Sequence, residues 1–336
     1  MFCRQLPFFL LLPLLAAFGC KPMNYYLLHP LRPLADIYRE SSIFDQDPLR
    51  VHWVAYYPDK KEALPAILIH PDAGGLAEDM EGICQDFTRA GYFAVAVHYQ
   101  RLENLKNKNP LFPWKAPEEI TMSLAHLKEH PRIDPGKVGL LGFSKGGVLS
   151  LLMACQDTDI KAVVAYYPVI DFEEWLDFTR YSFPKSLAFR GIRRYFMKEL
   201  GAASWEEALG KLRMISPIHH VEDLEAPVLL IHGEKDRTAP LEQAQRFCLE
   251  LQSAHKNCEL FILAGAGHVF NFRDEKPGKA AWDKTMEFFD QHLKRKVIPS
   301  VNHPLIEKHK SCSFPRGDVD CISSFTYPPI YLILFS

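Results

Sequence analysis

A serine flanked by glycines lies between two apolar runs near the middle of the chain. Residues 142–146 (GFSKG) follow an apolar run that begins at Val138 and precede another that begins at Val148. The runs predict a buried strand and a buried helix, and the short link between them predicts a tight turn. Glycines suit this turn because a Cβ atom would crowd the helix against the strand. We therefore expect an exposed Ser144 hydroxyl on strained backbone, an arrangement called a nucleophile elbow.

The pattern alone also fits a plain structural role. A small-residue turn can simply let a helix pack closely on a strand, and a chance G-x-S-x-G is not rare in a chain with 18 glycines among 336 residues. The residues expected to act with the serine therefore decide between the two interpretations.

Two further strand ends carry such residues. The aliphatic run 228–231 leads into a polar loop with Asp236, and the run 260–263 leads into a glycine-rich loop with His268. Carboxyl ends of parallel strands meet at one edge of a sheet, so both loops are expected beside Ser144. Asp236 alternatively suits a surface turn that bonds its own backbone, and the carboxylate would then come from Glu234.

The chemistry of serine hydrolysis requires this combination. A serine hydroxyl is a poor nucleophile at neutral pH, and an imidazole that takes its proton makes it reactive. A carboxylate behind the imidazole fixes its tautomer and stabilises the imidazolium. We predict Ser144 as nucleophile, His268 as base and Asp236 as acid, although His268 on its own also suits an ordinary loop histidine. The order serine, aspartate, histidine along the chain is that of the α/β-hydrolases.

An acyl-transfer site also needs N–H donors for the oxyanion. The backbone N–H of Lys145, the residue after the serine, is the first predicted donor. The second is expected in the loop after the strand at 66–70, where Pro71 has no N–H to give. Asp72 is therefore the second predicted donor, with Ala73 as the alternative. The same loop is otherwise only a glycine-rich turn.

Several segments together resemble dienelactone hydrolases and related α/β-hydrolases, namely 70–75, 142–147, 162–168, 232–236 and 265–270. The resemblance covers residues 50–294 and implies an α/β-hydrolase fold, a triad of serine or cysteine with aspartate and histidine, and hydrolysis of an ester or lactone. Dienelactone hydrolases proper carry cysteine as the nucleophile, whereas this chain has Ser144. The difference favours the serine-esterase branch of the superfamily.

Two shorter resemblances keep related reactions open. Residues 216–233 resemble the catalytic domain of prolyl-oligopeptidase-type peptidases, and residues 137–147 resemble acyl-CoA thioesterases and bile-acid acyltransferases. These families usually carry a propeller or a β-sandwich domain, and the stretch before the first predicted strand is too short for either. Hydrolysis of a carboxylic ester or lactone is therefore preferred, with thioesterase, acyltransferase and peptidase activities as alternatives.

Strands that alternate with amphipathic helices predict an α/β fold with a mostly parallel sheet flanked by helices. Strands are expected at 51–57, 66–70, 93–98, 138–143, 162–167, 228–232 and 259–263. Helices are expected at 77–90, 117–129, 145–154, 241–251 and 279–293. We assign residues 21–296 to one α/β-hydrolase domain and residues 297–336 to a poorly ordered tail.

The composition of the chain excludes several classes of binding partner. With 48% hydrophobic residues, the 336-residue chain can bury a substantial core. A net charge of −2 without a basic stripe predicts no nucleic-acid partner. The sequence has no metal-ligand spacing, and we predict neither a metal nor a cofactor.

An insertion at about 171–215 interrupts the hydrolase pattern and predicts a helical cap over the site. It is rich in aromatic residues and contains a basic cluster at 190–194. The aromatics could shape an apolar substrate pocket while the arginines meet an anionic group. The simpler interpretation, which we prefer, is a helical core with solvated arginines.

The N-terminus carries a predicted export signal. A short basic start precedes an apolar run at 6–19 that is too short to span a bilayer comfortably. Small residues then precede Cys20, which resembles a bacterial lipoprotein signal in which Cys20 is lipidated. We assign residues 1–20 to this signal segment, and the alternatives are plain secretion with cleavage near Gly19 and an uncleaved anchor. Each predicts a protein exported to the cell envelope or periplasm, or secreted.

The cysteines leave the disulfide pairing open. Cys84 and Cys155 are expected as small buried residues in or beside helices. Cys248 and Cys258 flank a helix-to-strand connection and could form a bridge in an oxidising compartment, but we expect free thiols there. The cysteines of the tail, Cys312 and Cys321, form a second possible pair.

The sequence leaves two classes of function open. The first is an exported serine hydrolase that acts on a small ester or lactone. The second is a catalytically silent α/β-hydrolase that serves as a binding module. A complete set of Ser144, Asp236 and His268 favours the first, because a binding scaffold has no need of all three.

Overall fold

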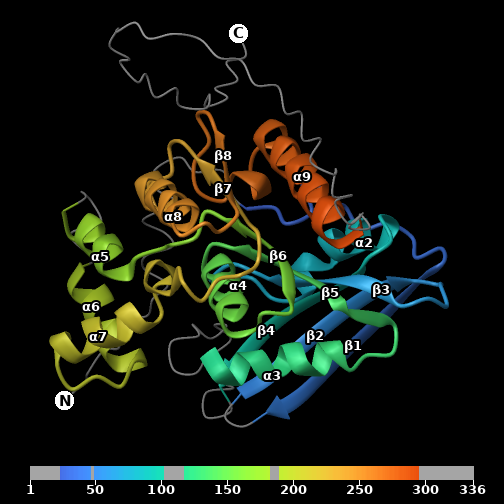
Figure 1. Cartoon of the computed structure of the whole chain (residues 1–336), viewed down its shortest axis with the longest axis horizontal. Coiled ribbons are helices and arrows are strands. Elements are labelled where there is room, and N and C mark those ends of the chain that lie inside the picture. Colours follow the sequence, from blue (N-terminus) through green and yellow to red (C-terminus); the bar gives the residue numbers. More distant parts are fainter. Residues whose placement is uncertain (1–22, 47–48, 102–116, 182–188, 295–336) are drawn as a thin grey trace, which may run out of the picture. The chain divides into compact units, whose positions relative to one another are not determined.

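The computed structural model describes residues 23–46, 49–101, 117–181 and 189–294 (Figure 1). All of these belong to one compact unit. The predicted signal segment with Cys20, and the tail with Cys312 and Cys321, lie outside the described residues.

The described residues form a single sheet flanked by helices. The strands are β1 (Ile37–Gln46), β2 (Leu49–Pro58), β3 (Leu64–His70), β4 (Phe93–Arg101), β5 (Ile133–Phe143), β6 (Ile160–Tyr166), β7 (Val228–Gly233) and β8 (Cys258–Leu263). The α-helices are α2 (Glu81–Arg89), α3 (Pro117–Lys128), α4 (Lys145–Gln156), α5 (Phe172–Tyr181), α6 (Phe189–Glu199), α7 (Trp205–Met214), α8 (Leu241–Ser253) and α9 (Glu275–Phe289). Short helical turns are η2 (Glu78–Met80), η5 (Pro217–His220), η6 (Phe270–Phe272) and the π-helical η7 (Asp290–Lys294).

The sheet has the strand order β1-β2-β4-β3-β5-β6-β7-β8. The pairs β1–β2 and β2–β4 are antiparallel, and every pair from β3–β4 to β7–β8 is parallel. The predicted α/β fold with a mostly parallel sheet is therefore confirmed. Because β5 lies between β3 and β6, the turn after β5 starts in the middle of the sheet, where open α/β sheets place their sites.

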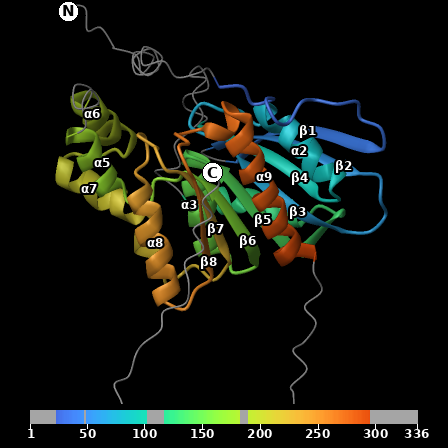
Figure 2. The same ribbon diagram turned by 90° about the horizontal axis from the view of Figure 1, so that it is seen from above.

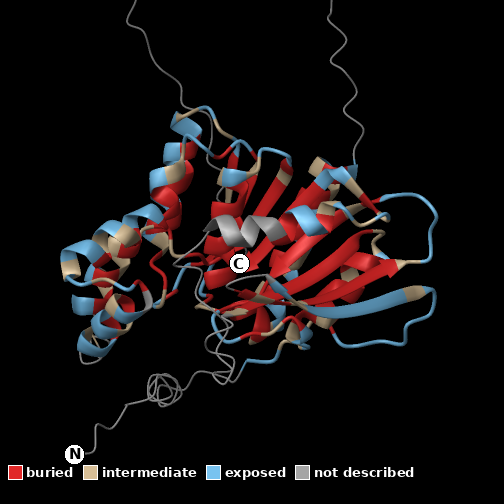
Figure 3. Ribbon diagram, turned by 90° about the horizontal axis from the view of Figure 1, so that it is seen from below, coloured by how far each residue is buried: buried red, intermediate tan, exposed pale blue. Residues whose placement is uncertain are grey.

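Strand β1 was not expected from the sequence. It forms the edge of the sheet, and most of its side chains are exposed, whereas the central strands are buried (Figure 3). Its mixed polar sequence, IYRESSIFDQ, lacks the apolar run of a buried strand. Strand β1 is therefore defined only by its pairing with β2, and no alternation of apolar and polar residues in the sequence predicts it.

Two apolar clusters cover the two faces of the sheet. One contains residues of α3, α4 and α8, such as Leu127, Leu151 and Phe247. The other contains residues of α2 and α9, such as Phe87 and Phe288. Figure 2 shows the corresponding helices along the sheet. The strands are apolar on both faces because both faces are covered.

The cap consists of α5, α6 and α7, which confirms the predicted helical insertion (Figure 1). Its helices share their own apolar cluster, which includes Leu176, Phe196 and Leu212. Val148 and Leu152 of α4 belong to the same cluster. The cap therefore packs on the helix that begins at the serine turn.

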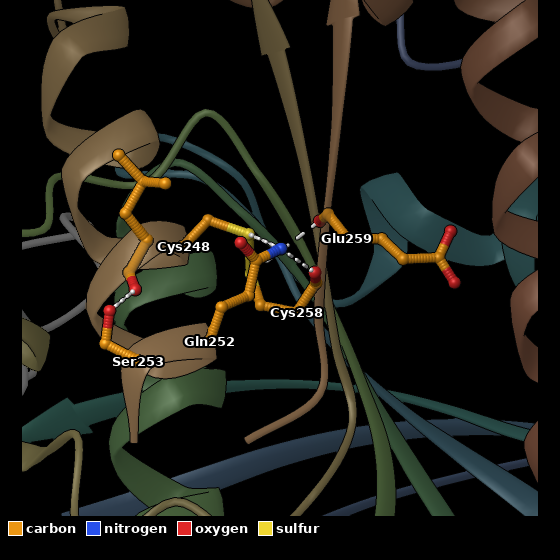
Figure 4. The surroundings of a disulfide bond; sticks show 6 residues. Cys248, Gln252, Ser253, Cys258 and Glu259 are labelled. Atoms are coloured by element: carbon orange, nitrogen blue, oxygen red, sulfur yellow. Dashed lines mark hydrogen bonds between the residues drawn. A yellow bond between two sulfur atoms is a disulfide. The ribbon is translucent and has the colours of Figure 1, made fainter. Parts of the chain in front are cut away.

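The expectation of free thiols at Cys248 and Cys258 was wrong. The two residues form a disulfide between α8 and the start of β8, with their Cα atoms 5.5 Å apart (Figure 4). Gln252 supports the connection, since its Nε2 donates to the carbonyl of Cys258 at 2.9 Å. The return of the chain from α8 into the sheet brings the sulfurs together, which the sequence spacing alone could not fix. Cys84 is buried and Cys155 is partly buried, both as free thiols.

Among the described residues, none of the helices has the length and apolar character needed to cross a bilayer.

Candidate active site

Ser144 lies on the turn between β5 and α4 with φ 50° and ψ −112°, a left-handed conformation that is costly for a residue with a side chain. Both neighbouring glycines are needed for close approach. A Cβ atom on Gly142 would lie 2.1 Å from the carbonyl oxygen of Gly146. A Cβ atom on Gly146 would lie 2.2 Å from the carbonyl oxygen of His70. The turn is therefore held against the end of β3 by direct backbone contact.

His268 reaches Ser144 from the loop between β8 and η6. Its Nε2 lies 3.1 Å from Ser144 Oγ, and its Nδ1 lies 2.7 Å from Asp236 Oδ2. The next residue, Val269, has φ 52° and ψ 32°, a rare conformation for a β-branched side chain. The structure thus brings the three residues predicted as a triad into one continuous chain of hydrogen bonds.

Asp236 is almost fully buried, and backbone donors fix its carboxylate. Its Oδ1 accepts the N–H groups of Thr238 at 2.7 Å and Ala239 at 2.9 Å, which leaves Oδ2 for His268. Burial by itself would raise the pKa of Asp236, but the charge and hydrogen bond of His268, with His232 nearby, outweigh it and lower the pKa. The carboxylate is therefore ionised at neutral pH.

Glu234, the alternative carboxylate, has a different partner. Its Oε2 accepts the N–H of Gly265 at 2.7 Å and so ties the loop after β7 to the loop after β8. Glu234 therefore stabilises the loop that carries His268, while Asp236 contacts the imidazole.

The loop after β3 forms a compact turn around Asp72. Its Oδ1 accepts the N–H of Gly74 at 3.0 Å, and its carbonyl accepts the N–H of Gly75 at 3.3 Å. Within the described residues, the amides of Asp72 and Ala73 make no hydrogen bond. Both residues suggested as oxyanion donors thus keep an N–H that the turn does not use.

Lys145 begins α4, so its amide belongs to the first helical turn, whose N–H groups the helical ladder does not use. Its side chain is buried, and burial lowers the pKa of the ammonium to about 8, although Asp72 opposes the shift.

His70, the last residue of β3, has its Nδ1 2.8 Å from Ser150 Oγ. Burial lowers the pKa of His70 to about 3, so the imidazole is neutral at pH 7.

Two tyrosines at this site were not assigned a role from the sequence. The ring of Tyr167 lies 4.6 Å from the imidazole of His268, and its hydroxyl donates to Asn271 Oδ1 at 2.6 Å. The hydroxyl of Tyr25 donates to Asp72 Oδ1 at 3.1 Å. Tyr167 is the last residue of the strand expected at 162–167 and was detectable by that position, whereas no sequence pattern marks Tyr25.

The cap contacts the loop that carries Asp236. Trp175 of α5 donates from Nε1 to the carbonyl of Thr238 at 2.7 Å. The cap arginines lie further along its helices, where the guanidinium of Arg193 stands 4.9 Å from the ring centre of Trp205. Arg193 and Arg194 are exposed, which agrees with the simpler interpretation of this cluster.

A serine on a strand-to-helix turn, with a histidine and a buried aspartate on later strand ends of a mostly parallel sheet, defines the chain as an α/β-hydrolase. In the part of the chain that the structure describes, His, Cys, Asp and Glu side chains form no cluster that could hold a metal.

The model of the dienelactone hydrolase family matches residues 52–293, and the chain belongs to this family. A relative from Bradyrhizobium, named "Probable 2-oxo-3-(5-oxofuran-2-ylidene)propanoate lactonase", is 24% identical over 245 residues, which are 68% of this chain and 85% of that protein.

Solved structures share the fold. An esterase from Thermogutta terrifontis has a TM-score of 0.57 and 19% identity, with 77% of this chain and 96% of that chain covered. An acylaminoacyl peptidase from Pyrococcus horikoshii has a TM-score of 0.60 and 21% identity. The match covers 78% of this chain but only 43% of the longer peptidase chain.

Proposed function

We propose that this protein is an exported serine hydrolase that cleaves a carboxylic ester or lactone through an acyl-enzyme intermediate. The observation that carries the proposal is the hydrogen-bond chain from Ser144 through His268 to Asp236, with distances of 3.1 Å and 2.7 Å. Membership of the dienelactone hydrolase family supports ester-bond hydrolysis, and the lactonase name of the Bradyrhizobium relative points to the same bond type.

In the first half of the reaction, Ser144 Oγ attacks the substrate carbonyl while His268 Nε2 takes the hydroxyl proton. The Nδ1–H of His268 donates to Asp236, which holds the tautomer that leaves Nε2 as acceptor. The carbonyl oxygen becomes an oxyanion, for which the N–H groups of Lys145 and Asp72 are the proposed donors. Collapse of the tetrahedral intermediate breaks the ester bond, and His268 returns its proton to the leaving alkoxide.

In the second half, water replaces the alcohol. His268 takes a proton from the water as it attacks the acyl-enzyme carbonyl, and the same oxyanion donors serve again. Collapse releases the carboxylic acid and returns the proton to Ser144 Oγ. In a lactone the leaving alkoxide stays attached to the acyl group, so a single hydroxy acid leaves in this step.

A serine nucleophile distinguishes the site from those of cysteine-dependent dienelactone hydrolases. Serine depends on a base for activation, whereas a cysteine is partly ionised at neutral pH by itself. Serine in place of cysteine at position 144 therefore supports general ester or lactone substrates over dienelactone itself.

Export is the second part of the proposal. The apolar run at 6–19 followed by Cys20 supports a lipoprotein signal, with lipid attachment at Cys20 and residence in the cell envelope. The Cys248–Cys258 disulfide favours an oxidising compartment, since such bonds are rare in the cytosol. Radiolabelled palmitate incorporation into the wild-type chain, lost in Cys20→Ser, would support lipidation. Export without incorporation would favour plain secretion.

Peptide hydrolysis is the alternative reaction that one observation favours. The fold matches the peptidase from Pyrococcus horikoshii with a TM-score of 0.60, although the chain spans less than half of that protein. The triad and the oxyanion donors would serve amide bonds by the same steps.

A fluorophosphonate probe and a substrate panel test the proposal. We expect the probe to label the wild-type chain and not Ser144→Ala, and p-nitrophenyl esters or lactones to be cleaved faster than acyl-CoAs and proline-containing peptides. Preferential peptide cleavage would replace the esterase assignment with the peptidase one. A folded wild-type chain that neither reacts with the probe nor cleaves any substrate would indicate a silent binding module.

A further inference from the structure

The segment at 24–33, which we call the N-terminal strap, packs against α2 and against the region around η6 and α9. The N–H of Asn24 donates to the carbonyl of Phe272 at 2.8 Å. Further along, His29 Nδ1 lies 2.9 Å from Asp86 Oδ2, and its ring packs edge-on against Trp282 at 4.5 Å. These contacts fix the strap at its first residue and near its middle.

Helix α2 is shaped to receive the strap. A Cβ atom on Gly82 would lie 1.8 Å from the carbonyl oxygen of His29, so only glycine permits this approach. The N–H of Arg32 also donates to Gln85 Oε1 at 2.9 Å. Backbone and side-chain contacts together hold the strap in one register along α2.

This register places Tyr25 at the loop after β3. Its ring packs edge-on against Phe272 with 4.8 Å between ring centres, and its hydroxyl donates to Asp72 Oδ1 at 3.1 Å. The ring contact fixes the direction of the hydroxyl. Burial, together with the nearby carboxylates of Asp72 and Asp79, raises the pKa of Tyr25, so the hydroxyl stays protonated and can only donate to the carboxylate.

The Asp72 carboxylate depends on this hydroxyl. Asp72 is 4% exposed, and its Oδ2 is buried without a hydrogen-bond partner in the described part of the chain. The donors to Oδ1 are the hydroxyl of Tyr25 and the N–H of Gly74. Loss of the hydroxyl would leave the turn with one donor to a buried carboxylate, which favours a rearranged loop.

We propose that Tyr25 is a positioning residue of the active site, whose hydroxyl holds Asp72 and thereby the loop that supplies the second oxyanion donor. The inference rests on the proposed esterase function for its kinetic consequence. An oxyanion donor acts within a narrow range of distances, about 2.7–3.1 Å, so a small shift of this loop weakens transition-state binding more than substrate binding. Within the N-terminal strap, this role belongs to Tyr25 alone.

Tyr25→Phe is the direct test because it keeps the ring against Phe272 and removes only the hydroxyl. We expect kcat on a p-nitrophenyl ester to fall about 10-fold to 100-fold, with KM changed less than about threefold. The adjacent Tyr26→Phe is the matched control. Its hydroxyl donates at 3.0 Å to the carbonyl of Glu78, away from the Asp72 carboxylate, and its loss should leave kcat unchanged.

A double-mutant cycle separates positioning from a general loss of structure. If Tyr25 acts through Asp72, removal of its hydroxyl should cost little further activity in an Asp72→Ala background. A full additional loss there, or a Tyr25→Phe enzyme with wild-type kcat, would overturn the proposal.

Amide hydrogen exchange provides a readout that needs no activity. Exchange of the Gly74 and Gly75 amides, which donate to Asp72, should be faster in Tyr25→Phe than in the wild-type chain and in Tyr26→Phe. Unchanged exchange would overturn the positioning role even in an active enzyme. Suppose that exchange is faster in Tyr25→Phe but the wild-type chain cleaves no substrate. The role of the Tyr25 hydroxyl in holding Asp72 would then stand, and the esterase function would be rejected.

Discussion

The serine turn and the helical cap respond in opposite ways to one added methyl group. At Gly146, in the first turn of α4, a Cβ atom would lie 2.2 Å from the carbonyl oxygen of His70. At Gly210, in the middle of α7, nothing lies within 4 Å of such an atom. The two segments are connected through the cluster that α4 shares with the cap. The comparison shows that the backbone at the serine turn leaves no room for an added atom, whereas the exposed face of the cap helix does.

The largest expected effect is on activity at the catalytic edge. Ser144→Ala should lower kcat about a million-fold, because removal of the nucleophile disables the whole triad. The exposed cap residue Arg194 provides the contrast, and Arg194→Ala should retain wild-type kcat/KM on a neutral ester. Steady-state kinetics on a p-nitrophenyl ester, with circular dichroism to verify folding, would measure both. Comparable losses in the two variants would contradict the contrast.

The second test adds the methyl group itself. Gly146→Ala should lower the free energy of unfolding by at least about 3 kcal/mol, because the new atom meets backbone that cannot move aside easily. Gly210→Ala should raise it by about 0.8 kcal/mol, since alanine is the better helix former and the space is open. Urea unfolding measures both values. Equal effects of the two substitutions would show that the serine turn is no more tightly packed than helix α7 of the cap.

The disulfide provides a third test, because the cap segment at 172–214 contains no cysteine. Replacing Cys248 and Cys258 together by serine should lower the free energy of unfolding by about 3 kcal/mol, since the closed loop no longer restricts the unfolded chain. Dithiothreitol should reproduce the loss in the wild-type chain and leave the double variant unaffected. Insensitivity of the wild-type chain would mean that the bridge does not contribute.

Protonation of histidine at acid pH should lower the free energy of unfolding through the sheet and not through the cap. Residues 172–214 of the cap contain no histidine, just as they contain no cysteine. Burial lowers the pKa of His70 to about 3 from its ordinary value of 6.5. Between these values the unfolded chain binds more protons, so stability is complete above about pH 6.5 and falls as the pH falls, by about 1.4 kcal/mol per pH unit for this histidine.

Unfolding in urea between pH 7 and pH 4 would measure this slope. His70→Gln should reduce the slope of unfolding free energy against pH by about 1.4 kcal/mol per pH unit, which corresponds to one proton. The same substitution at the exposed His219 should leave the slope as in the wild-type chain. A slope unchanged in His70→Gln would show that other groups cause the acid sensitivity.

The smallest expected effect on stability and turnover is at the contact between the cap and the loop that carries Asp236. Trp175→Phe keeps an aromatic ring and removes the hydrogen bond to the carbonyl of Thr238, which should cost about 1 kcal/mol of stability. The N–H groups of Thr238 and Ala239 still hold Asp236, so kcat should change less than about twofold. A large loss of kcat would mean that the cap, and not only these amides, positions the catalytic loop.

The sequence predicts the central sheet and the triad of Ser144, Asp236 and His268 because each depends on local patterns. Apolar runs locate β5, β7 and β8, and the loops at their ends contain Ser144, Asp236 and His268. Parallel pairing then brings these ends together without further information. Helix α9 begins at Glu275, earlier than expected, because a proline at 277 is tolerated in a first helical turn.

Features defined by contacts between distant segments could not be predicted in this way. Strand β1 depends on pairing with β2, and the disulfide depends on how α8 returns to β8. The contact between Tyr25 and Asp72 joins residues 47 positions apart and has no periodic signal on either side. The contact of Tyr25 with Asp72 can therefore be identified only from the structure, whereas the triad residues can be identified from the sequence.

The strap has a practical consequence for the preparation of this enzyme. A fusion partner or affinity tag joined directly before Asn24 would begin one residue from Tyr25, whose hydroxyl touches the Asp72 turn. Recombinant versions trimmed close to this point, or extended there by bulky sequence, should differ in turnover even when their melting temperatures agree. Assays that compare preparations should therefore specify the first residue of the purified chain.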